Sequence, residues 1–157
     1  MKNSLKLLPA GLIPFALGYA FNYLILRFPL FVRFIFPLSL LCTVLWGRLS
    51  YTLSNPRESP FPQALLMCSP GLLVLALLLF QALVLKRYWM NAIGSWSQLY
   101  FLPFLNISSS LLSPPLSALW GTASLSALYA GSWLAMFSSC LTGILLKRGH
   151  TGLLRFR

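Results

Sequence analysis

The run LSALWGTASLSALYAGSWLAMFSSCLTGILL, from Leu116 to Leu146, decides the fold of this chain. It carries no charged side chain. At every fourth position the run gives an unbroken row of small side chains: Ala123, Ala127, Gly131, Ala135, Ser139 and Gly143. On an α-helix that rises about 1.5 Å per residue, this row extends over about 30 Å, the hydrocarbon thickness of a bilayer. The run therefore predicts a transmembrane helix with one flat side.

The opposite side of the same helix is bulky, with Leu125, Tyr129, Trp133, Phe137 and Leu141. Small side chains let helix backbones approach closely in lipid. We therefore expect the six residues of the row to be helix-packing residues. Three alternatives remain for this row: it packs against another helix of the same chain, it packs against another subunit, or it lines a cavity.

The composition of the whole chain indicates an integral membrane protein. Of its 157 residues, 58% are hydrophobic and only 8% are charged, far from the balance of a soluble domain. No polar stretch is long enough to fold as a separate soluble domain. The sequence predicts an all-α, polytopic helical membrane protein with a single transmembrane domain over residues 1–157.

Four apolar runs are expected to cross the membrane: residues 7–26, 31–53, 64–85 and 116–146. The residues from Ser54 to Pro62 contain three prolines and predict a loop. Residues 89–112 are harder to place, because Pro103, Asn106 and three serines interrupt their apolar character. We expect an interfacial helix or a re-entrant segment there, with an aromatic belt of Trp89, Trp96 and Tyr100 at the headgroup level. A fifth crossing remains the alternative.

The charges are one-sided: twelve Lys and Arg against one acidic residue, giving a net charge of +11. The cations flank apolar runs, as expected of residues that face anionic lipid headgroups, and they form no surface that could track nucleic acid. Four spans with both termini inside place eight cations inside: Lys2, Lys6, Arg48, Arg57, Lys147, Arg148, Arg155 and Arg157. The positive-inside rule favours this topology, and we expect it in a bacterial cytoplasmic membrane.

Two arginines of the second run are candidates for a binding site. Fourteen residues separate Arg33 from Arg48, which is about 21 Å of helix and too short to leave both charges in water. One interpretation is an intramembrane cation that holds an anionic ligand or lipid headgroup. The other is ordinary snorkelling of both side chains toward the interfaces.

The sequence excludes several kinds of chemistry. Glu58 is the only acidic residue and His150 the only histidine, so no carboxylate or imidazole metal site, catalytic residue or cofactor is predicted. The missing embedded acid also argues against ion-coupled transport. Cys42, Cys68 and Cys140 lie in apolar runs without CxxC spacing, as small buried hydrophobic residues do.

These observations favour a small transport-type or complex-forming membrane subunit. It would associate through its last helix with itself or with another membrane subunit. Two alternatives belong to other classes: a membrane-embedded enzyme that acts on a lipid-like anionic substrate held by Arg33 or Arg48, and a structural or regulatory membrane protein.

Overall fold

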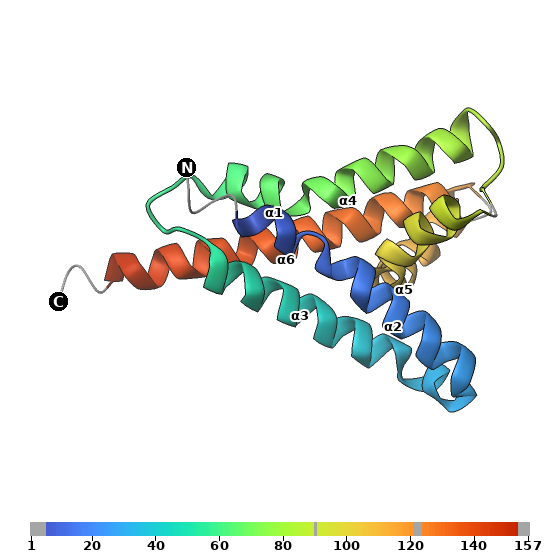
Figure 1. Ribbon diagram of the computed structural model, residues 1–157, viewed down its shortest axis with the longest axis horizontal. Coiled ribbons are helices and arrows are strands. Elements are labelled where there is room, and N and C mark those ends of the chain that lie inside the picture. Colours follow the sequence, from blue (N-terminus) through green and yellow to red (C-terminus); the bar gives the residue numbers. More distant parts are fainter. Residues whose placement is uncertain (1–5, 90, 121–123, 154–157) are drawn as a thin grey trace.

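The computed structural model describes residues 6–89, 91–120 and 124–153, which form a helical bundle (Figure 1). The elements are α1 (Leu7–Ala10), α2 (Ile13–Arg27), η2 (Pro29–Phe34), α3 (Ile35–Leu53), α4 (Pro60–Leu83), α5 (Ala92–Trp120) and α6 (Leu125–Leu153). No strand occurs among these described residues. The predicted all-α class is confirmed.

Four stretches are long and apolar enough to cross a membrane: Leu7–Arg27, Pro29–Leu53, Pro60–Leu83 and Leu125–Thr151. Successive stretches run in opposite directions, so the start of α1 and the end of α6 lie at the same end of the bundle (Figure 1). This end also holds the connection between α3 and α4. The predicted helical membrane protein with four spans is confirmed at this level.

The bounds of all four spans differ from those expected, by one or two residues in the first two spans and by more in the last two. The third begins at Pro60 instead of residue 64, because proline in the first helical turn needs no N–H partner. The last begins at Leu125 instead of Leu116, because α5 continues through Pro114 and Pro115 as far as Trp120. Both prolines are exposed, where the carbonyls that lose a helical hydrogen bond are not enclosed by the core. Of the predicted small row, Ala123 lies outside the described residues.

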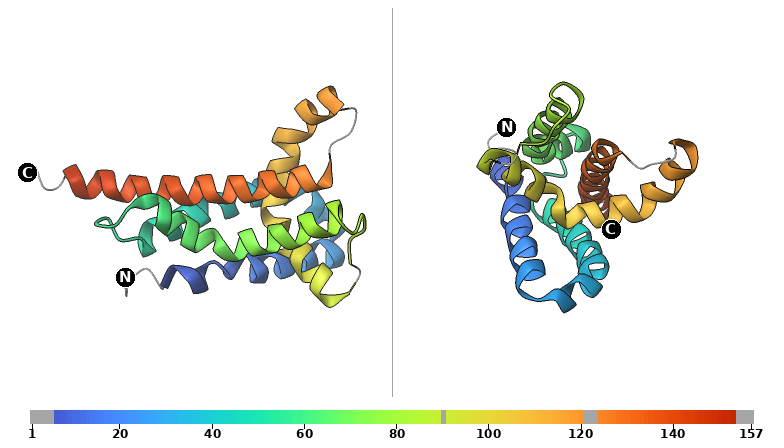
Figure 2. Two further views of the ribbon diagram at one scale, coloured as in Figure 1. Left: turned by 90° about the horizontal axis from the view of Figure 1, so that it is seen from above. Right: turned by 90° about the vertical axis from the view of Figure 1, so that its right-hand side faces the viewer.

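Helix α5 lies across the four spanning stretches instead of along them (Figure 2). It crosses near the end of the bundle where α4 ends and α6 begins. Its middle is enclosed, with Tyr100, Phe101 and Phe104 all 0% exposed. The segment expected to be interfacial or re-entrant is therefore a transverse helix that packs against α2, α3, α4 and α6. Tyr100 does not belong to a headgroup belt, because the core buries it.

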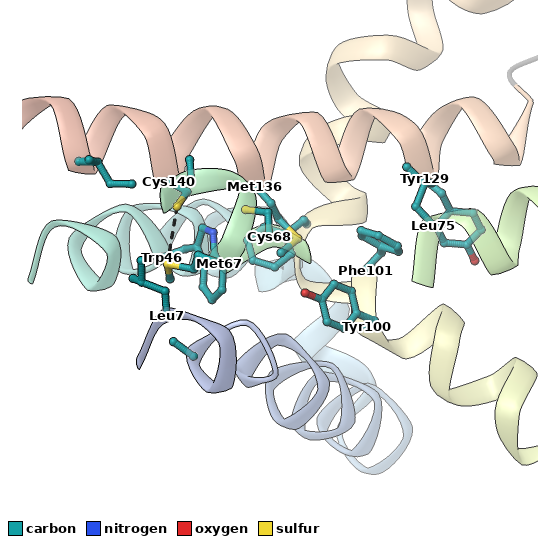
Figure 3. Packing of buried hydrophobic residues seen from close by; sticks show 14 of the residues in the cluster. Leu7, Trp46, Met67, Cys68, Leu75, Tyr100, Phe101, Tyr129, Met136 and Cys140 are labelled. Atoms are coloured by element: carbon teal, nitrogen blue, oxygen red, sulfur yellow. Dashed lines mark hydrogen bonds between the residues drawn. The ribbon is translucent and has the colours of Figure 1, made fainter. Parts of the chain in front are cut away.

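One continuous core joins α5 to the spanning helices (Figure 3). Trp46 of α3 packs edge-on against Phe104 of α5, with ring centroids 6.3 Å apart. Phe101 of α5 lies 5.9 Å from Tyr129 of α6 by the same measure. Aromatic contacts of this kind add to the burial of apolar area, so the core fixes where α5 crosses the bundle.

Candidate functional site

Glycines on three helices make room for α5. A Cβ atom on Gly18 of α2 would overlap the carbonyl of Leu99, and one on Gly71 of α4 would lie 2.9 Å from the Tyr100 ring. A Cβ on Gly131 of α6 would collide with Ser108 and Leu112 of α5. Since any larger residue would push α5 outward, the crossing depends on glycine at these three positions.

Two long-range hydrogen bonds hold α5 in this position. Tyr100 Oη donates to the carbonyl oxygen of Gly11, at the break between α1 and α2, over 2.9 Å. Ser108 Oγ donates to the carbonyl oxygen of Leu128 in α6 over 2.8 Å. Both side chains are buried, so these bonds satisfy polar groups that have no access to water. The transverse helix is thus fixed at both sides of the bundle.

An apolar cleft opens on each side of the Trp96 side chain. The first part, about 270 Å³, lies between α2 and α5 and is lined by Phe15, Ala16, Tyr19, Trp96 and Leu99. The second part, about 380 Å³, lies between α4 and α5 and adds Val74, Leu77, Ala92 and Ile93 to the lining. Phe15 and Trp96 line both parts, with ring centroids 6.4 Å apart. We call the two parts together the Trp96 cleft.

The lining of the Trp96 cleft is hydrocarbon and aromatic carbon with few polar groups. Ser97 lines the second part, but its hydroxyl already donates to the Gly94 carbonyl oxygen over 2.7 Å. Trp96 is 65% exposed and Tyr19 67% exposed, so the cleft is open along the outer surface of the bundle. Such a cleft suits a hydrocarbon chain better than a polar reactant.

The single histidine and the single acidic residue of the chain do not line the Trp96 cleft. Tyr51 Oη and His150 Nδ1 are 3.1 Å apart at the end of the bundle that holds the last turns of α3 and α6. Glu58, in the connection between α3 and α4, accepts a hydrogen bond from Asn55 Nδ2 over 3.1 Å. Within the described part of the chain, no three His, Cys, Asp or Glu side chains group together as metal ligands.

The small row of α6 faces other helices of the same chain. Gly131 meets α5, whereas Gly143 meets the carbonyl of Gly47 in α3. Ser139 Oγ donates to the Thr43 carbonyl oxygen of α3 over 2.6 Å. Ala127 and Ala135 are half-buried. The described part of the row therefore contacts α5 at one end and α3 at the other.

The two candidate arginines are not brought together. Arg33 lies in η2 and Arg48 in the last third of α3, and both are exposed. Neither lines the Trp96 cleft. The sequence drew attention to the cleft only through the aromatic character of residues 89–100, since nothing in a helical pattern shows that Phe15 and Trp96 meet.

No protein-family model, curated protein or solved structure matches this chain. Its class therefore follows from the fold alone. The four apolar helices define an integral membrane protein of the all-α class, and the transverse helix with the Trp96 cleft is its distinguishing feature.

Proposed function

We propose that this chain is a lipid-binding membrane protein that takes a hydrocarbon chain of an anionic lipid into the Trp96 cleft. The observation that supports this most is the cleft itself: aromatic walls from two helices, carbon lining and an opening along the surface that faces lipid. A lipid chain already resides in a medium of the same polarity, so the cleft would select it by shape and aromatic contact.

Two cations next to the cleft would receive the headgroup. Lys86 and Arg87 are exposed and lie between α4 and α5, a few residues before Ala92 of the lining. The buried Gln81 fixes this turn, because its carbonyl oxygen accepts from Arg87 N over 3.1 Å and its side-chain Oε1 from Trp89 N over 2.9 Å. The proposal thus assigns the headgroup to Lys86 and Arg87, and no longer to Arg33 or Arg48.

Retention of phosphatidylglycerol by the purified full chain, measured by native mass spectrometry, tests the proposal. Trp96→Ala should weaken retention about tenfold, because it removes the shared wall of both parts of the cleft. Phe34→Ala is the matched control, since Phe34 is a similarly exposed aromatic residue of η2. Replacing Lys86 and Arg87 by Gln should remove the preference for phosphatidylglycerol over phosphatidylcholine. Equal retention by Trp96→Ala and Phe34→Ala would contradict the proposal.

A second candidate function is that of a complex-forming membrane subunit. The last part of α5 projects away from the bundle (Figure 2), and Leu111 at its base is 67% exposed. Because α3 and α5 occupy the small row of α6, a partner would sit on this projection instead of on that row. Cross-linking of Ser117→Cys between chains in lipid nanodiscs tests this. The cross-link should exceed that of Gly149→Cys, and equal yields would reject the subunit role.

For the orientation, we propose that the end of the bundle that holds the start of α1 and the end of α6 faces the cytoplasm. Among the described cations, Lys6, Arg48, Arg57, Lys147 and Arg148 lie toward that end, and Arg27, Arg33, Lys86 and Arg87 toward the other. Lys2, Arg155 and Arg157 are close in sequence to the first group. The positive-inside rule supports this orientation in a cytoplasmic membrane.

A further inference from the structure

A pair of aromatic rings divides the Trp96 cleft into its two parts. Phe15 of α2 and Trp96 of α5 line both parts, and their ring centroids lie 6.4 Å apart with an angle of 49° between the ring planes. A chain carbon packs at about 3.5–4.0 Å from the carbon atoms on each side of it. Two rings with a hydrocarbon chain between them therefore need a separation of at least about 7 Å. A chain cannot pass between Phe15 and Trp96, so the two parts are separate places for hydrocarbon.

Each part has room for one chain. The first part, about 270 Å³, lies between α2 and α5, and the second, about 380 Å³, lies between α4 and α5. A carbon-lined cavity of about 150 Å³ holds one benzene molecule. By this scale the first part takes about eleven carbon atoms and the second about fifteen. Each part therefore accommodates most of one acyl chain.

We propose that the Trp96 cleft selects lipids with two acyl chains, and that it places one chain in each part with the Phe15 and Trp96 rings between them. This inference rests on the proposed lipid-binding function and names its substrate class, a diacyl lipid with an anionic headgroup. The two chains of such a lipid start from neighbouring atoms of one glycerol. A cleft whose two parts begin at one pair of rings matches this branching, whereas a lipid with one chain fills only one part.

The cations assigned to the headgroup lie at the end of α5 where the chains would begin. Lys86 and Arg87 belong to the connection that leads into the first turn of α5. Ala92 and Trp96, which line the cleft, lie on the first two turns of that helix. They are about 6 Å apart along its axis, at about 1.5 Å per residue. One lipid with its headgroup at these cations would thus start both chains near Trp96.

The wild type alone provides the first test, by native mass spectrometry of the purified full chain. Phosphatidylglycerol is compared with lysophosphatidylglycerol, which has the same headgroup and one acyl chain of the same length. Because the second chain adds contacts with the carbon lining, phosphatidylglycerol should be retained at least about tenfold better. Equal retention of the two lipids would overturn the two-chain site but not lipid binding, which is judged by Trp96→Ala against Phe34→Ala. No retention of either lipid would overturn both.

Filling one part at a time provides the second test. Ala16 lines only the first part and Ala92 only the second, and both are exposed. Ala16→Trp and Ala92→Trp should each retain phosphatidylglycerol about tenfold less, with little preference left over lysophosphatidylglycerol. The matched controls are Ala20→Trp in α2 and Ser95→Trp in α5, since both positions are exposed and neither lines the cleft. Circular dichroism and gel filtration show which variants keep the fold.

The two single variants have to agree. If only one of them retains less phosphatidylglycerol than its control, a site for one chain explains the binding and the proposal is overturned. It is also overturned if both behave as their controls do. The variant with both parts filled should lose lysophosphatidylglycerol as well, because neither part stays free. Retention of that lipid at the wild-type level would mean that the chains bind outside the cleft.

Discussion

Gly47 of α3 and Gly143 of α6 lie backbone against backbone: a Cβ atom on Gly143 would overlap the carbonyl oxygen of Gly47. Hydrogen bonds on both sides reinforce this contact. Ser50 Oγ donates to the Cys140 carbonyl oxygen over 2.9 Å, and Ser139 Oγ donates to that of Thr43 over 2.6 Å. In lipid, where apolar burial does not drive helices together, close packing and hydrogen bonds of this kind must hold α3 to α6.

Substitution of Gly143 should therefore loosen the bundle. Gly143→Ala is expected to lower stability by about 1–3 kcal/mol, because the added methyl group meets backbone atoms that cannot rotate away. Thermal unfolding in detergent measures this. Gly149→Ala, in the same helix, is the control, since a Cβ there meets nothing within 4 Å. It should be neutral or stabilising by up to about 1 kcal/mol. Equal stability of the two variants would contradict the contact.

The hydrogen bond from Tyr100 to Gly11 gives a second prediction. Tyr100→Phe removes the hydroxyl group from a fully buried ring and leaves the Gly11 carbonyl oxygen without that donor. We expect a loss of about 1–3 kcal/mol in the same unfolding measurement. Tyr23→Phe is the matched control, because Tyr23 of α2 is 57% exposed. A loss in Tyr23→Phe as large as in Tyr100→Phe would show that the effect is not specific to the bond.

Lys147 should stabilise the end of α3. Its Nζ donates to the carbonyl oxygens of Thr52 and Ser54, at the C-terminus of that helix, where a cation is favourable. Lys147→Met is expected to cost about 1 kcal/mol, less than the roughly 1.5–3 kcal/mol of hydrogen bonds to charged groups, because Lys147 is only half-buried and solvent weakens the interaction. The neighbouring Arg148 is exposed, so Arg148→Met serves as control and should change stability by less than about 0.5 kcal/mol. If Lys147→Met and Arg148→Met unfold along indistinguishable curves, Lys147 does not stabilise the end of α3.

Labelling of single cysteines by a membrane-impermeant reagent should test the topology. Because α5 lies across the bundle, Asn91→Cys and Ser124→Cys, which flank it, should be labelled from the same side. Arg57→Cys and Gly149→Cys should be labelled from the other side. A background in which Cys42, Cys68 and Cys140 are replaced by Ala makes each label unambiguous, provided that it still inserts. Labelling of Asn91→Cys and Ser124→Cys from opposite sides would mean that α5 crosses the membrane.

The sequence anticipated part of the candidate site and missed the rest for a physical reason. The small row of α6 was visible as a pattern, because helical periodicity places every fourth residue on one side. Its partners were not, because α3 and α5 meet it across distances in sequence that no local pattern encodes. The same holds for the Trp96 cleft, whose walls come from α2, α4 and α5.

Prolines explain where the expected bounds failed. The sequence predicts that the last helix begins at Leu116, directly after Pro114 and Pro115, since local rules disfavour proline inside a helix. They lie instead within α5, on its projecting part, and α6 begins at Leu125. Local preference determines how unfavourable a proline inside a helix is. The packing of the whole helix decides whether that unfavourable free energy is offset.

The sequence by itself determined the class of this protein and the number of its apolar spans, because a bilayer requires long uncharged runs whose backbone is bonded internally. Only the tertiary structure decided that residues 92–120 cross the other helices, that Gly47 meets Gly143, and that Met67 meets Cys140. Those pairings depend on which surfaces fit together in three dimensions. Small residues permit close approach at many places, and the shape of the assembled bundle selects among them.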